Sequence, residues 1–117
     1  MAQIKLTLDQ VGELSQNALE TAGTSAENAA SVARSTVRAE RDGIRSHGLM
    51  YVPIYAEHVS CGKVDGRAVP SVERTRGSAI CVDAKSGFAH PAIDAGWQTL
   101  TDAARENGVA AMTINNS

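Results

Sequence analysis

Hydrophobic residues in the first half of the chain recur at intervals of three and four, which is the period of an amphipathic helix. The first such stretch begins at Thr7-Leu8-Asp9-Gln10, where Thr7 and Gln10 can form a capping box, and it stops at Gly23. Its hydrophobic face comprises Leu8, Val11, Leu14, Ala18 and Ala22. The pattern therefore predicts a helix between residues 7 and 23.

Two further helical stretches follow in the first half. The second is predicted to start with another capping box, Thr24-Ser25-Ala26-Glu27, and to stop at Gly43. Its hydrophobic face comprises Ala29, Val32, Ala33, Thr36 and Val37. The third stops near Gly62, and Pro53 either begins its regular part or kinks it. The face of this third helix comprises Leu49, Val52, Tyr55, Ala56 and Val59.

The second half of the chain alternates between strand and helix patterns. Residues 72–76 and 79–82 are typical of the two strands of a hairpin, joined at Gly77-Ser78. A helix from about Pro91 comes next, and Trp97 is expected in the core because the hydrophobic stripe comprises Ile93, Trp97, Leu100 and Ala104. Residues 109–114 are apolar at nearly every position, which predicts a central strand covered on both faces.

These elements predict an α/β protein with two parts. Residues 1–62 are expected to form a helical N-terminal substructure, and residues 63–117 the first strands of a mixed sheet. The chain stops at Ser117 just after the apolar strand, whose open edge would aggregate if nothing paired with it. We therefore expect the chain to be a truncated or processed piece, completed by additional polypeptide.

Composition and charge narrow the classes of function. The 117 residues are 43% hydrophobic and 21% charged, which is typical of one soluble globular domain. A net charge of −2 and an aromatic content of 3% disfavour a nucleic-acid-binding protein. No apolar run is long enough for a membrane span, and neither Cys61 nor Cys81 has the spacing of a metal ligand. The cytoplasm is therefore the expected compartment, with both thiols reduced.

The residues that suggest chemistry lie at Ser46-His47-Gly48, between the second and third helices. Ser46 is a favourable N-cap, and the N–H groups of Gly48 and Leu49 would be unpaired donors that could bind a substrate carboxylate. A histidine titrates near neutral pH, so His47 could give a proton to a carbonyl that is being reduced. The alternative is that Ser46 simply caps a helix and His47 is a surface residue.

The other polar candidates point to structural roles. His58 is expected in solvent, and His90 is expected at the start of the helix that contains Pro91. Asp42 is expected to form a surface ion pair with Arg38 or Arg41. Neither of the glycine-rich nucleotide-binding loops occurs in the sequence.

The corner and its surroundings resemble a known enzyme family. Asp42-Gly43-Ile44-Arg45-Ser46-His47-Gly48-Leu49, followed by Pro53 and Tyr55, is similar to the N-terminal part of the type 2 malate/lactate dehydrogenases. The order of the predicted elements matches that family along the whole chain. The resemblance implies a non-Rossmann fold and the use of NAD or NADP. It also implies hydride transfer between a 2-hydroxy acid and a 2-keto acid, or reduction of a related C=N bond.

The same resemblance implies roles for individual residues. His47 would be the catalytic proton donor and a cofactor contact, with Ser46 and Tyr55 beside it in the active site. The implied substrate contacts are Ser46, Gly48 and Tyr51, and the implied cofactor contacts near the end of the chain are Asn116 and Ser117. Tyr51 is a departure, because many members of the family have an arginine there that can pair with the substrate carboxylate.

The complete enzyme is then expected to combine this chain with a companion C-terminal polypeptide. It would act on a small molecule and form a homo-oligomer, most simply a dimer. A second hypothesis, from a different class, is a non-catalytic assembly or binding module built on the helical hairpin at residues 7–42.

Overall fold

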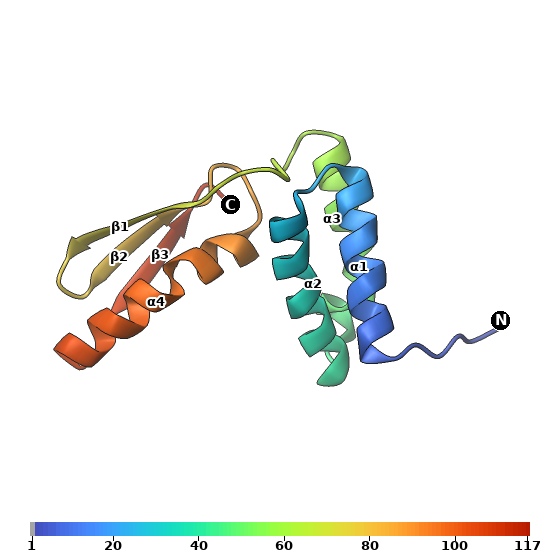
Figure 1. The fold of residues 1–117 in the computed structure, drawn as a ribbon, viewed down its shortest axis with the longest axis horizontal. Coiled ribbons are helices and arrows are strands. Elements are labelled where there is room, and N and C mark those ends of the chain that lie inside the picture. Colours follow the sequence, from blue (N-terminus) through green and yellow to red (C-terminus); the bar gives the residue numbers. More distant parts are fainter. Residues whose placement is uncertain (1) are drawn as a thin grey trace. The chain divides into compact units, whose positions relative to one another are not determined.

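The computed structural model describes residues 2–117, which divide into two compact units (Figure 1). The first unit extends to Lys63 and the second begins at Val64. The described part of the first unit is helical, whereas the second combines a sheet with one long helix. A helical part therefore precedes a mixed α/β part, in the order predicted from the sequence.

Three α-helices and two short 3-10 helices make up the first unit. In chain order they are α1 (Leu8–Ala22), α2 (Ala26–Arg41), η1 (Arg45–His47), η2 (Leu49–Tyr51) and α3 (Val52–Ser60). Pro53 lies in the first turn of α3, so it begins this helix rather than kinking it. Because α1 packs against both α2 and α3, it is the central helix of the unit (Figure 1).

The ends of α1 match the sequence prediction, but its buried face does not. Thr7 Oγ1 accepts from the Gln10 N–H at 3.1 Å, and Gln10 Oε1 accepts from the Thr7 N–H at 2.9 Å. The buried residues are Val11, Ser15 and Leu19, whereas Leu14 of the predicted face is 53% exposed. Ser15 can be buried because its hydroxyl donates to the Val11 carbonyl at 2.7 Å.

The start of α2 differs from the predicted capping box. Ser25, not Thr24, is the N-cap, and its hydroxyl accepts from the Asn28 N–H at 3.3 Å. Thr24 is instead buried, with 3% of its surface exposed. The predicted face of this helix is confirmed, since its buried residues include Ala29, Val32, Ala33 and Thr36.

The second unit is a three-stranded mixed sheet with one helix against it. Its elements are β1 (Ser71–Arg76), β2 (Ala79–Asp83), α4 (Ala89–Asn107) and β3 (Ala111–Asn115). The strand order is β1-β2-β3, with β1 antiparallel to β2 and β2 parallel to β3. The hairpin predicted at Gly77-Ser78 is confirmed, and α4 makes the crossover that the parallel pair requires.

One face of the sheet packs against α4 and forms the core of the unit (Figure 1). The buried residues of this core are Ile80, Val82, Ala84, Ala92 and Ala103. β3 is an edge strand whose residues alternate between exposed and half-buried. The expectation of a central strand covered on both faces is therefore not met within residues 2–117, because the single helix covers only one face.

The buried side of α4 is displaced by one residue from the predicted stripe. Ala92, Gly96 and Ala103 are buried, whereas Trp97, which was expected in the core, is 57% exposed. A Cβ on Gly96 would lie 2.8 Å from Val82 Cγ2 and would also collide with the sulfur of Met112. Small residues therefore face the sheet because they let the helix approach it closely.

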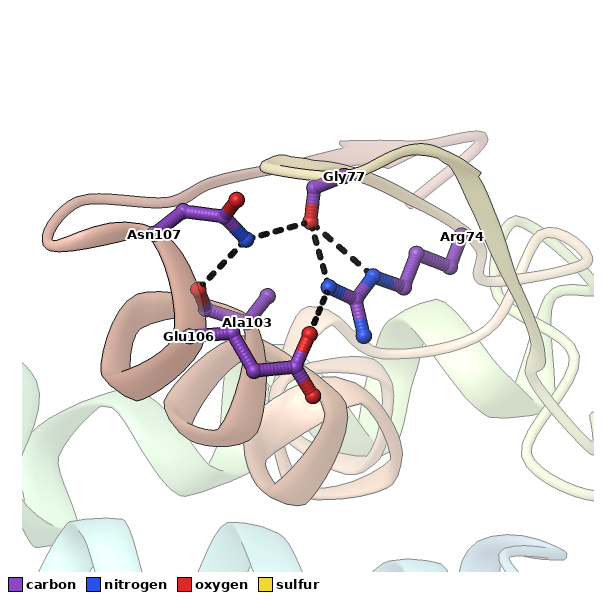
Figure 2. A network of polar contacts seen from close by, with 5 residues as sticks. All are labelled: Arg74, Gly77, Ala103, Glu106 and Asn107. Carbon is purple, nitrogen blue, oxygen red and sulfur yellow. Dashed lines mark hydrogen bonds and ion pairs between the residues drawn. The ribbon is translucent and has the colours of Figure 1, made fainter.

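A polar network joins the tip of the hairpin to the last turn of α4 (Figure 2). The Gly77 carbonyl accepts from Arg74 Nε at 2.9 Å, from Arg74 Nη2 at 2.7 Å and from Asn107 Nδ2 at 3.2 Å. Arg74 Nη2 also pairs with Glu106 Oε2 at 2.6 Å, and this hydrogen bond lowers the pKa of Glu106. The network holds the strand tip and the helix end together.

Close packing at Gly96 leads to a stability prediction. We expect Gly96→Ala to lower the free energy of unfolding of the whole protein by about 1–3 kcal/mol, because the added methyl overpacks the contact with Val82 and Met112. Urea denaturation would measure the change. Gly12→Ala in α1 is the matched control, since its Cβ would lie 3.2 Å from Val37 Cγ2, a less severe contact than the one at Gly96. Equal stability of Gly96→Ala and wild type would contradict the close packing.

Candidate functional site

The predicted corner between α2 and α3 consists of two successive 3-10 turns. The His47 N–H donates to the Ile44 carbonyl at 3.1 Å, and the Gly48 N–H donates to the Arg45 carbonyl at 3.1 Å. The Tyr51 N–H then donates to the Gly48 carbonyl at 3.1 Å. Gly48 thus joins η1 to η2 and is buried, whereas His47 is exposed.

Ser46 and His47 form a hydrogen-bonded pair at this corner. Ser46 Oγ lies 3.0 Å from His47 Nδ1, and both side chains are exposed. The prediction that Ser46 caps a helix is wrong, because neither η1 nor η2 has a side-chain cap. Since Nδ1 is engaged by Ser46, Nε2 is the ring nitrogen that can face a substrate.

The Gly48 and Leu49 N–H groups, where the sequence predicts an anion site, both donate to acceptors within the chain. The Gly48 N–H is used within the 3-10 turn, and the Leu49 N–H donates to Glu40 Oε1 at 2.8 Å. Neither donor is available to a substrate carboxylate in this arrangement. Glu40 lies nine residues before Leu49, in the last turn of α2, and no local motif links the two positions.

Tyr51 and Tyr55 form an aromatic pair next to the corner. Their ring centroids are 4.8 Å apart at an interplanar angle of 67°, which is an edge-to-face arrangement. Burial raises the pKa of the Tyr55 phenol, and Tyr51 raises it further. The Tyr55 hydroxyl therefore keeps its proton at neutral pH. The structure thus brings Ser46, His47, Gly48, Tyr51 and Tyr55 together in the first unit.

The two remaining site candidates lie in the second unit, at the carboxyl ends of the parallel strands. Asn116 Nδ2 donates to Asp83 Oδ1 at 3.1 Å, and the Asn116 carbonyl accepts from the Ser86 N–H at 2.7 Å. Asp83 also accepts from the Lys85 N–H at 2.8 Å, and these bonds lower the pKa of Asp83. Asn116 is therefore partly engaged, whereas Ser117 is exposed.

Several other expectations concern single residues. Arg41 pairs with Asp42 at 2.8 Å, which confirms the surface ion pair. Both cysteines, Cys61 and Cys81, are free. Residues 2–117 contain no cluster of His, Cys, Asp and Glu that could hold a metal ion. No helix within the same residues is long and apolar enough to cross a membrane.

His90 is the second residue of α4, in agreement with its predicted place at the start of a helix. It is half-buried and lies against the ring of Phe88, with centroids 6.5 Å apart. Burial lowers the pKa of His90, and the nearby Asp94 carboxylate offsets part of this effect. The folded state therefore favours the neutral ring.

The lowered pKa of His90 predicts how the free energy of unfolding depends on pH. The unfolded chain binds a proton at His90 near pH 6.5, above the lowered pKa of the folded state, so stability falls as the pH drops below 6.5. We expect His90→Gln to flatten this part of the curve of unfolding free energy against pH. Urea denaturation between about pH 7.5 and 5 would measure it, with the value at pH 7.5 as the internal reference. If the slope of this curve in His90→Gln equalled that of wild type, the lowered pKa of His90 would be contradicted.

Comparison with known proteins gives consistent matches along the chain. Residues 6–117 match the malate/L-lactate dehydrogenase family. A Delta(1)-pyrroline-2-carboxylate reductase of Ancylobacter novellus is 39% identical over 113 residues, which are 97% of this chain and 33% of that protein. A (2R)-3-sulfolactate dehydrogenase (NADP(+)) of Chromohalobacter salexigens is 40% identical over 112 residues, which are 96% of this chain and 33% of that protein.

A solved structure shows the same fold. The delta1-piperideine-2-carboxylate reductase of Pseudomonas syringae pvar. tomato superposes with a TM-score of 0.94 at 38% identity. The match covers 98% of this chain and 35% of that one. The chain thus spans about a third of the length of these relatives, and the similarity extends over both units.

Proposed function

Because the chain belongs to the malate/L-lactate dehydrogenase family, we propose that the whole protein is an NAD(P)H-dependent reductase. Its substrate would carry a C=N or C=O bond next to a carboxylate. This proposal is supported by the relatives, which are named as reductases of cyclic imine carboxylates and as a sulfolactate dehydrogenase. The match over residues 6–117 also favours an enzyme over a module confined to the helical hairpin.

A cyclic imine carboxylate is the substrate class that we favour. Tyr51 stands where many family members would have an arginine, so this position offers an aromatic ring rather than a cation. The paired rings of Tyr51 and Tyr55 suit a flat cyclic imine that binds uncharged, because an aromatic face attracts the positive charge that the ring gains when its nitrogen takes the proton. A 2-keto acid, as first expected, is the second candidate, and the sulfolactate dehydrogenase relative supports it.

The observation that carries the proposal is the pair formed by Ser46 and His47, with Ser46 Oγ 3.0 Å from Nδ1. Reduction adds a hydride to the carbon and a proton to the nitrogen or oxygen, so a proton donor is required at that atom. The imidazolium donates Nδ1–H to Ser46 and presents Nε2–H to the substrate. After the proton leaves Nε2, the ring keeps its Nδ1–H and its bond to Ser46. In this arrangement Ser46 holds the ring at Nδ1 and leaves Nε2 for the transfer to the substrate.

A bound reduced nicotinamide would supply the hydride. Asn116 and Ser117 were expected to contact it, and the groups still available there are Asn116 Oδ1 and the Ser117 hydroxyl, since Asn116 Nδ2 is bonded to Asp83. These two groups fit contacts to the polar parts of a nucleotide, and we assign them binding only. We further propose that additional polypeptide pairs with the open edge of β3 and that the enzyme is a cytoplasmic homo-oligomer.

A panel of substrates tests the function directly. We expect the whole protein to oxidise NADPH or NADH at least about tenfold more efficiently with Δ1-pyrroline-2-carboxylate or Δ1-piperideine-2-carboxylate than with pyruvate or oxaloacetate, as measured by kcat/KM. 3-Sulfopyruvate would represent the keto-acid alternative. A clear preference for 3-sulfopyruvate would select that alternative, and no oxidation with any member of the panel would contradict the proposed function.

The role of His47 is tested by substitution. We expect His47→Ala to lower kcat by at least about a hundredfold, while the Kd of the nicotinamide cofactor changes little. His47→Asn keeps a hydrogen-bond donor but cannot give up a ring proton, so it should be equally slow. Rates near wild type in His47→Asn would show that the proton comes from another residue.

A further inference from the structure

We propose that Glu40 is the positioning residue that holds the corner of His47 in its reactive shape, an inference that rests on the function proposed above. Glu40 belongs to the last turn of α2 and is half-buried. Its Oε1 accepts from the Leu49 N–H at 2.8 Å. A hydrogen bond between an ionised carboxylate and a backbone N–H is stronger than one between neutral groups. It ties the end of one helix to the turn that follows the corner.

The position of Gly48 is a second observation for the same contact. A Cβ on Gly48 would lie 2.6 Å from Glu40 Cδ and 2.9 Å from Cγ, and would collide with Oε1. Glycine is therefore required at position 48, because the side chain of Glu40 occupies the space that a Cβ would need. The Glu40 side chain lies directly over the backbone of the residue that follows His47.

The geometry shows how this contact reaches His47. η1 ends at His47 and η2 begins at Leu49, so Gly48 alone separates the proton donor from the N–H that Glu40 holds. The first N–H groups of a short helix lack partners within the helix and need an outside acceptor. Glu40 supplies that acceptor at Leu49. Without this hydrogen bond, the two turns would be held less firmly to the end of α2, and the direction of the His47 ring would no longer be fixed.

The proposal also gives the carboxylate a role in selecting where the substrate binds. Glu40 Oε1 occupies the donor that a substrate carboxylate could otherwise use, and it places a negative charge beside it. A substrate anion is thereby kept away from the Leu49 N–H. The reacting bond would then be presented to Nε2 of His47, the ring nitrogen that does not contact Ser46.

The test uses the whole protein with three substitutions at one position. Glu40→Ala removes the acceptor, Glu40→Asp shortens the side chain by a methylene, and Glu40→Gln keeps an acceptor oxygen at the same length. Glu13→Ala is the matched control, because Glu13 is an exposed glutamate in the middle of α1. The measurements are amide hydrogen exchange at Leu49, kcat and KM for the best substrate of the panel, and the Kd of NADPH.

We expect Glu40→Ala to speed exchange at Leu49 by about tenfold or more, because it breaks the only bond that Leu49 N–H makes to a side chain among residues 2–117. The kcat should fall by about 10- to 100-fold through misplacement of His47, with the Kd of NADPH nearly unchanged. Glu40→Gln keeps the acceptor oxygen but loses the charge, so both measurements should lie between those of Glu40→Ala and those of wild type. Glu40→Asp should resemble the alanine variant, and Glu13→Ala should resemble wild type.

Three outcomes would overturn the proposal. Unchanged exchange in Glu40→Ala would show that the bond does not hold the corner in solution. Faster exchange with unchanged kcat would make Glu40 a structural cap without a positioning role. A loss of activity in Glu40→Gln equal to that in Glu40→Ala would also contradict it. If the alanine variant fails to fold, Glu40→Asp takes its place in this comparison. If wild type reduces no substrate of the panel, the proposed function is wrong, and exchange at Leu49 alone decides whether Glu40 holds the corner.

Discussion

Close approach of backbone at small residues is the constraint on which both units depend. With aromatic residues at 3% of the sequence, few large side chains are available to fill space between elements. The elements instead lie close together, with Ala29 and Ala33 on the buried side of α2 and Gly96 on the buried side of α4. The same constraint applies at Gly48, where the carboxylate of Glu40 rather than a strand lies over the backbone. Dense packing of this kind leaves no room for an added methyl group at Gly48 or Gly96.

The ends of the elements could be predicted because they depend on local chemistry. Thr7 and Gln10 cap α1 as their spacing indicates, and Gly77-Ser78 forms the hairpin turn. Each of these features involves residues only a few positions apart, so the sequence contains nearly all the information needed. The second capping box was wrong by one residue, because tertiary packing buries Thr24 and leaves Ser25 to cap the helix.

The buried faces were harder to predict. Counting large hydrophobic residues placed Leu14 and Trp97 in the core, where the structure has Ser15 and Gly96. Hydrophobic periodicity gives weight to side-chain size, but a tight interface selects residues that are small. Serine satisfies its hydroxyl within the helix, and glycine requires no space, so both can be buried at little cost. The burial of Ser15 and Gly96 cannot be predicted until the surface against which each helix packs is known.

In the candidate site, too, the features set by neighbouring residues could be predicted, whereas the contacts between distant residues could not. The corner at Ser46-His47-Gly48 could be located from the sequence, but the hydrogen bond from the Leu49 N–H to Glu40 could not. It also placed Asn116 at the end of a strand, without the bond to Asp83 that occupies its amide. These contacts join residues nine and 33 positions apart, so they depend on how separate elements are brought together.

The network around the Gly77 carbonyl has a consequence for how the sheet assembles. β2 and β3 are parallel neighbours separated by the whole of α4, so pairing them directly from an extended chain would require closure of a long loop. Asn107 brings the end of the helix to the hairpin tip, and the Ala111 N–H then donates to the Ser78 carbonyl at 2.8 Å. Once α4 has formed and reached Gly77, the remaining loop is only a few residues long. The hydrogen bonds of the parallel pair can then form in order from Ala79 and Ala111 toward Asp83 and Asn115. The entropic cost of this pairing is close to that of a local hairpin.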